Sequence, residues 1–199
     1  MEYSKEYKIG KKMIIESDFS VKSVKTFMGR EGIGVNANIY YQNRKIGHII
    51  DSGNGGCLDI TYYTKVNGKD KWIPKNSVVD NFVSKLPTYK YDGGLNGVKL
   101  RPEHSFDEED MWNALVDEYL FVRDFKKAMK KIQVVHNGKV FTFVKDNKPH
   151  FLDKSYRYKG KNGVSFRKII KDMYDGCTIL NDVSNNKAMR LFRTHCNPN

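Results

Sequence analysis

Residues 29–63, GREGIGVNANIYYQNRKIGHIIDSGNGGCLDITYY, predict the fold of the first half of this chain. Three runs rich in β-favouring residues, 34–41, 46–50 and 57–64, are separated by polar segments. The first connection covers residues 42–45, and the second, 51–56, consists of six turn-forming residues in a row. We therefore expect a three-stranded antiparallel meander.

The first of these runs predicts two different faces for the sheet. Alternation places Val35, Ala37, Ile39 and Tyr41 on one side of the strand. Its other side carries Asn36, Asn38 and Tyr40. A sheet with one apolar and one polar face is expected to pack its apolar side on helices.

Three motifs in this stretch resemble a set of small proteins encoded by phages, prophages and other mobile elements. They are GREGIG at 29–34, NANIY at 36–40 and DSGNGGC at 51–57. The chain also resembles a type II anti-CRISPR group that inhibits Cas9. This resemblance implies a mobile-element origin and a protein that binds a defence complex. Its glycine-rich turns would contact the partner protein, through Arg30, Glu31, Asp51 and Asn54.

Composition points to one ordinary domain, or to one domain with a small appendage. The chain has 199 residues, of which 39% are hydrophobic, and this is enough to bury a core. No run approaches the length of a membrane span, and residues 1–6 are polar. Three cysteines at unhelpful spacings predict reduced thiols. We expect a cytoplasmic protein of a bacterial host cell, with no membrane contact.

The net charge of +12 is confined to one part of the chain. Residues 1–122 contain 17 basic and 17 acidic side chains, whereas residues 123–199 contain 18 basic and 6 acidic ones. A region of one sign is what a polyanion-binding surface requires, because each cation on a phosphate releases counterions. The alternative, a basic but otherwise unremarkable soluble protein, stays open.

Outside the meander, patterning predicts several further strands and one helix in the N-terminal half. Residues 11–16 and 21–27 are expected to be strands, the second with Val21, Ser23, Lys25 and Phe27 on one face, and residues 71–74 a further strand. The glycines at 29, 32 and 34 favour a bent strand entry over a nucleotide-binding loop, because a strand follows them. Asn76 or Ser77 begins a short helix, and residues 89–103 are expected to be a long loop.

A capping box, Ser105 to Glu108, predicts a long helix over residues 106–131. Its buried positions are expected at intervals of three and four, namely at Trp112, Leu115, Tyr119, Val122, Phe125, Met129 and Ile132. The predicted fold is therefore α+β: an antiparallel meander packed with a long helix, then a basic hairpin and short helices. We divide it into residues 1–103, a sheet subdomain, and 104–199, a basic helical and hairpin subdomain, within one compact unit.

The basic half contains a hairpin signal, Asn137-Gly138, within residues 134–144. Residues 154–161, KSYRYKGK, alternate aromatic and basic side chains, as single-stranded nucleic-acid surfaces do and as ordinary basic edge strands also do. Helices are expected at 166–174, with Ile169, Ile170 and Met173 packed, and near 187–193, followed by a fraying tail. The candidate nucleic-acid-binding residues are Lys126, Lys127, Lys130, Lys131, Lys154, Tyr156, Arg157, Tyr158, Lys159, Lys161, Arg167, Lys168 and Lys171.

No set of residues makes a convincing catalytic or metal site. Cys57 has no histidine placed to activate it and is expected to be a buried small hydrophobe. His195-Cys196 with Cys177 lacks the paired spacing of a zinc site. Asp51, Asp59 and Lys65 fall short of a nuclease carboxylate cluster. We expect no catalysis, no metal and no cofactor.

Two hypotheses of function follow from these observations. In the first, the protein is a non-catalytic inhibitor, encoded by a phage or mobile element, that binds a nucleoprotein defence complex such as Cas9 with guide RNA. In the second, it is a stand-alone nucleic-acid-binding accessory protein, and a small nuclease is a distant third. The sequence does not determine the oligomeric state, or whether DNA or RNA is preferred.

Overall fold

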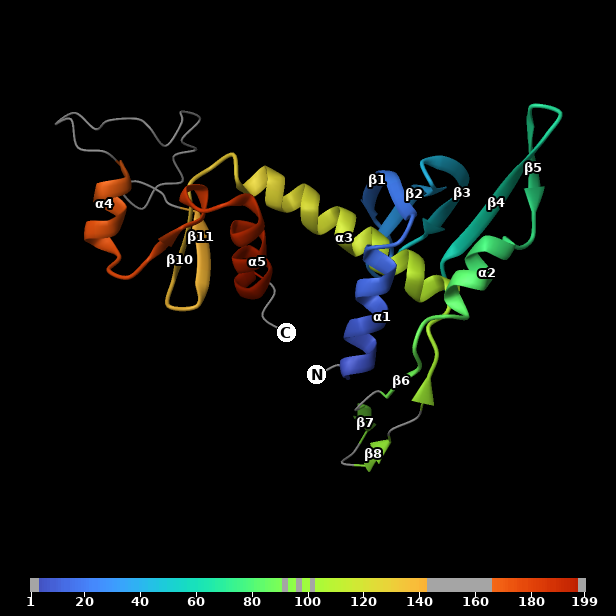
Figure 1. Ribbon diagram of the computed structural model, residues 1–199, viewed down its shortest axis with the longest axis horizontal. Coiled ribbons are helices and arrows are strands. Elements are labelled where there is room, and N and C mark those ends of the chain that lie inside the picture. The colour runs from blue at the N-terminus through green and yellow to red at the C-terminus, as the bar shows by residue number, and fades with distance from the viewer. Residues whose placement is uncertain (1–3, 91–92, 96–97, 101–102, 143–165, 197–199) are drawn as a thin grey trace. The chain divides into compact units, whose positions relative to one another are not determined.

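The computed structural model describes residues 4–90, 93–95, 98–100, 103–142 and 166–196 (Figure 1). It divides into two compact units, Met1–Leu120 (unit 1) and Phe121–Asn199 (unit 2). The division falls inside a long helix, α3 (Glu108–Ala128), rather than at the sequence-based boundary after Glu103. The α+β class with an N-terminal antiparallel meander is confirmed.

Unit 1 is built on a five-stranded sheet whose strands follow one another in sequence order, each antiparallel to the next. Its strands are β1 (Phe19–Met28), β2 (Ile33–Tyr41), β3 (Arg44–Asp51), β4 (Asp59–Val66) and β5 (Lys69–Ile73). The predicted meander, β2 to β4, is confirmed, as is the strand near residue 72. Figure 1 shows β4 and β5 as a hairpin that extends beyond the other strands.

The first predicted strand is wrong, because residues 11–15 belong to a helix and Glu16 is its C-terminal cap. Helix α1 (Lys5–Ile15) begins at Ser4, whose side-chain oxygen accepts a hydrogen bond from the Tyr7 backbone N–H. Its fully buried residue is Ile14, which joins the core of unit 1. The Ser4 cap and the burial of one helix face favour the helix over the predicted strand.

The predicted faces of β1 are also wrong beyond Lys22. The pairing with β2 shifts between Lys22 and Lys25, and Ser23 has a positive φ of 56°. This bulge places both Val21 and Val24 in the core and leaves Ser23 exposed. A strict two-residue period therefore does not describe this strand.

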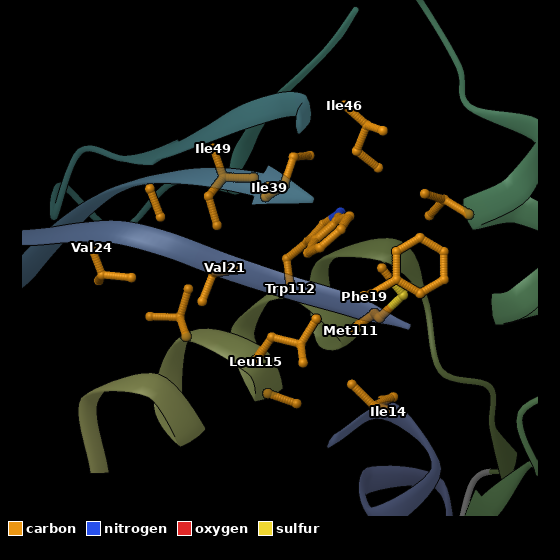
Figure 2. Close-up of a cluster of buried hydrophobic side chains, with 14 of the residues drawn as sticks. Ile14, Phe19, Val21, Val24, Ile39, Ile46, Ile49, Met111, Trp112 and Leu115 are labelled. Atoms are coloured by element: carbon orange, nitrogen blue, oxygen red, sulfur yellow. The ribbon is translucent and has the colours of Figure 1, made fainter. Parts of the chain in front are cut away.

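The core of unit 1 lies between one face of the sheet and the helices. Figure 2 shows side chains of β1, β2 and β3 meeting those of α3 and α1, with Trp112 among them. Ala37, Ile39 and Ile49 are fully buried on the sheet side, and Met111 and Trp112 are fully buried on α3. Helix α2 (Ser77–Val83) begins at the predicted Asn76 cap and adds Val79. The inward face predicted for β2 is confirmed.

The capping box of α3 is not the predicted one. Asp107 and Asp110, rather than Ser105 and Glu108, exchange side-chain bonds with each other's backbone N–H, at 2.7 and 3.3 Å. Burial raises the pKa of the Asp110 carboxyl above its usual range.

Glu108 does not cap the helix, because its carboxylate accepts a hydrogen bond from the hydroxyl group of the buried Tyr62. That same hydroxyl oxygen accepts a 2.9 Å bond from the Trp112 indole N–H. Burial, and then the Glu108 acceptor, raise the pKa of the Tyr62 phenol above its ordinary value. The helix therefore docks on β4 through a chain of two hydrogen bonds, of which the Trp112–Tyr62 bond is buried and the Tyr62–Glu108 bond is part-buried.

The segment predicted as one long loop contains four short strands in two ladders. They are β6 (Tyr89–Lys90) paired with β9 (Glu103–His104), and β7 (Gly93–Leu95) paired with β8 (Val98–Leu100). The absence of a sequence period reflects their length of two or three residues rather than a lack of pairing.

Unit 2 contains the predicted hairpin, β10 (Gln133–His136) and β11 (Lys139–Thr142), with positive φ at Asn137 and Gly138. Strand β12 (Thr178–Ile179) pairs with β10, and a short 3-10 helix, η1 (Leu180–Asp182), follows it. The predicted helices are confirmed as α4 (Phe166–Met173) and α5 (Asn185–Cys196). Two expectations fail: Met173 is 61% exposed, and the tail stays helical through Cys196 instead of fraying at Arg193.

Candidate nucleic-acid interface and partner-binding turns

The basic end of α3 is the first part of the candidate interface. Lys126 and Lys127 are exposed in the last turn of the helix, and Lys130 is exposed just beyond it. Lys131 is half-buried. The helix ends at Ala128, three residues before the predicted end at Lys131. Phe125, one residue before this cationic group, is 1% exposed and packs on Leu180 and Ala188. The buried ring fixes the helix end, so the lysines next to it are held at the surface.

Helix α5 brings a second row of cations beside the end of α3. Ala188, Leu191 and Phe192 face the core of unit 2, and Phe192 lies 5.4 Å from Phe125, centroid to centroid. The exposed positions of α5 include Lys187, Arg190 and Arg193, spaced by three residues. The Arg193 guanidinium lies 4.0 Å from the centroid of the Phe121 ring.

These α5 cations were not among the predicted binding residues. Their spacing of three, alternating with the apolar residues of an amphipathic helix, was the available signal.

The remaining predicted cations are only partly covered by the structure. Lys168 and Lys171 are exposed on α4, whose Ile170 is fully buried against Ile132, Val134 and Ile179. Arg167 lies on α4, but its side chain lies outside the described part. The aromatic and basic segment lies wholly outside the described residues and comprises Lys154, Tyr156, Arg157, Tyr158, Lys159 and Lys161.

The four predicted partner-binding residues are brought together in two adjoining turns, which we call the paired turns (residues 29–32 and 51–57). Asn54 accepts a bond from the Arg30 backbone N–H at 3.0 Å, and Glu31 N–H donates to the Gly53 carbonyl at 2.8 Å. Asp51 accepts from the Gly53 N–H at 2.8 Å. The Asp51 and Asn54 side chains therefore hold the turns, whereas Arg30 and Glu31 take part through their backbones and remain exposed.

Gly29 is needed in these turns for close approach, not for an unusual backbone angle. A Cβ at Gly29 would lie 2.5 Å from the Ser52 carbonyl oxygen. Gly53 and Gly55, in contrast, have φ of 67° and 72°. Cys57, expected to be buried, is exposed at the end of the second turn. The strand ends beside the first turn expose Met28 by 82% and Ile33 by 63%.

The residues considered for metal or nuclease chemistry do not form a cluster in the described part of the chain. No group of three His, Cys, Asp or Glu side chains there could hold a metal ion. Asp51 is bonded within its own turn, and Lys65 forms a 2.6 Å ion pair with Asp70. No helix within the described ranges is long and apolar enough to cross a membrane.

Comparison of the chain with protein-family models, curated proteins and solved structures finds no match. The function is therefore inferred from the residues and their arrangement.

Proposed function

We propose that this protein binds nucleic acid without catalysis through unit 2, and that it inhibits a nucleoprotein defence complex on behalf of a phage or mobile element. The observation that supports binding is the location of the charge. Unit 2 carries 18 basic and 6 acidic side chains, whereas unit 1 is neutral. Exposed cations from the end of α3, from α4 and from α5 are attached to buried residues that fix their positions.

The inhibitor role adds a protein contact at the paired turns. Arg30 and Glu31 have exposed side chains of opposite sign on backbone that is hydrogen-bonded to the second turn. A rigid, charged turn with exposed apolar residues beside it suits protein recognition. The motif resemblance to phage proteins and to a Cas9-inhibitor group supports the same role, in a bacterial cytoplasm. The alternative, a stand-alone nucleic-acid-binding protein, needs only unit 2.

Nucleic-acid binding is tested with two triple variants that remove equal charge. In one, Lys126, Lys127 and Lys130 become Gln; in the control, the exposed Lys5, Lys8 and Lys12 of α1 become Gln. Fluorescence anisotropy with duplex and single-stranded probes is measured across salt concentrations. The α3 variant should lower the slope of log affinity against log salt by about 2–3, since each phosphate contact contributes about 0.7–0.9. If the two variants change the slope equally, the lysines at the end of α3 form no specific binding surface, and the positive charge of unit 2 serves only solubility.

The inhibitor role is tested separately by exchanging the paired-turn charges, Arg30→Glu with Glu31→Arg. This exchange keeps net charge and leaves the backbone bonds of both residues available. Co-elution with a Cas9 and guide RNA complex, and inhibition of its DNA cleavage, are measured. Loss of both with unchanged binding to free nucleic acid is the expected result. If the wild-type protein neither co-elutes nor inhibits, this target is excluded and the stand-alone role is favoured.

A further inference from the structure

The face of the unit 1 sheet opposite the core has a composition unlike an ordinary solvated face. The helices of unit 1 contribute Ile14, Val79 and Trp112 to the core on the other side. Strand alternation directs Asn36, Asn38 and Tyr40 of β2 to the opposite face. There, Asn38 pairs in register with Lys22 of β1 and His48 of β3. We call this side the open face.

Aromatic rings recur across the open face on neighbouring strands. Tyr63 of β4 shares a 2.8 Å hydrogen bond with His48 Nδ1, and the two rings are 5.7 Å apart between centroids. Tyr63 pairs with Trp72 of β5, whose side chain is 61% exposed. Tyr40 and Tyr63 lie two strands apart, about 9–10 Å by the usual strand spacing. A tryptophan this exposed on a strand has not been placed there by core packing.

Cations and amides lie between and beside these rings. The exposed Lys22 ammonium is 4.5 Å from the centroid of the Tyr40 ring and 3.3 Å from Asn43 Oδ1, so it lies beside both the ring and the amide. Lys45 is exposed and pairs with Tyr40. Asn36 and Asn38 offer both donors and acceptors at the surface, the groups that recognise base edges.

We propose that the open face binds unpaired nucleotides of a single-stranded nucleic acid. Tyr40, Tyr63 and Trp72 stack on bases, Lys22 and Lys45 neutralise phosphates, and Asn36 and Asn38 contact base edges. Open antiparallel sheets with exposed rings stack about two or three bases in this way. This site is separate from the unit 2 cations. It includes Asn36, Asn38 and Tyr40 of the NANIY motif, and so assigns that motif a role in binding. A duplex, whose bases are already stacked, does not fit this face.

The experiment compares Trp72→Ala, Tyr40→Leu and Asn38→Ala with the control Ile9→Ala, an exposed α1 residue on the helical side. Anisotropy is measured with short single-stranded RNA, single-stranded DNA and duplex DNA. Each ring variant should weaken single-strand binding about tenfold, because stacking of one base contributes about 1–3 kcal/mol and each 1.4 kcal/mol is a factor of ten. Duplex binding and the salt slope should not change, and circular dichroism should show an intact fold. The RNA and DNA probes then show which sugar is preferred.

Unchanged single-strand affinity in both ring variants would overturn the proposal, whatever the unit 2 triple variant does. Equal losses for single strands and duplex would overturn it too, because base stacking cannot produce them. A change in oligomeric state on size-exclusion chromatography, with nucleic-acid binding intact, would assign the face to a second copy instead. A lower salt dependence in the unit 2 triple variant tests the function proposed for unit 2 and does not test the open face.

Discussion

The two units are stabilised in different ways. Among the described residues, unit 1 has one continuous core of 17 buried side chains, whereas unit 2 has two clusters, of four and three. Unit 2 adds a polar core residue, Gln133, which is 3% exposed. Apolar patterning thus defines the neutral unit, and polar side chains that bind backbone groups help to define the basic one.

Asn181 shows how the basic unit uses such a side chain. Its amide nitrogen donates to the carbonyls of Met129 and Lys131, and its oxygen accepts from the Gln133 N–H at 2.9 Å. Gln133 in turn donates to the Ala128 carbonyl and to Thr142, each at 3.0 Å. The chain therefore leaves α3 and enters β10 through bonds to side chains instead of through a glycine cap.

The largest effect on stability is expected from Trp112→Ala in unit 1. Removing a fully buried indole from a continuous core is expected to lower the free energy of unfolding by about 3–5 kcal/mol. Urea denaturation followed by circular dichroism measures the change. Trp72→Ala is the control, since that ring is 61% exposed and its loss should change stability by less than about 0.5 kcal/mol. If Trp112→Ala lowers the free energy of unfolding no more than Trp72→Ala does, the stability of unit 1 does not depend on the packing of this ring.

The next test addresses unit 2 through Asn181→Ala. This change leaves two carbonyls and one N–H without their partner and is expected to cost about 1–3 kcal/mol. Amide hydrogen exchange at Gln133 should accelerate, because its N–H loses its acceptor. The exposed Asn186 of α5, changed to Ala, is the matched control and should have little effect. If Asn181→Ala is as stable as this control, apolar packing alone holds unit 2.

The smallest expected effect is that of Tyr62→Phe, which keeps the apolar ring of unit 1 and removes only the hydroxyl. The indole N–H of Trp112 is then buried without its acceptor, which should cost about 1–2 kcal/mol. Tyr63→Phe is the comparison, because its bond to His48 is part-buried and solvent can replace it in part. A larger loss at Tyr63 than at Tyr62 would contradict the polar chain between β4 and α3.

Sequence reasoning found the parts whose signals are local. The turn residues at Asn137-Gly138, the Asn76 cap and the alternation of β2 each predict one element, and each element is present. It failed where a distant residue decides the outcome. Glu108 looks like half of a cap but bonds to Tyr62 on a strand, and α1 has β-branched residues but packs as a helix.

The functional surfaces divide in the same way. The unit 2 charge is a property of composition, and it could be counted without coordinates. The paired turns were found as motifs, but their hydrogen bonds joining residues 29–32 to 51–57 could not be inferred from spacing. The open face depends on the registers of five strands, which bring Lys22, His48 and Trp72 onto one surface.

The first turns of helix α3 pack in the core of unit 1 and its last turns pack in unit 2, and this sets the order in which the two cores form during synthesis. When α3 emerges, β1 to β5 have already been made, so Trp112 finds its partners at once. Phe125 must wait, because Leu180 and Ala188 follow much later in the chain. During that interval the nascent chain exposes an aromatic ring next to a cluster of lysines. The ring is a binding site for chaperones, and the lysines attract anionic ribosomal RNA.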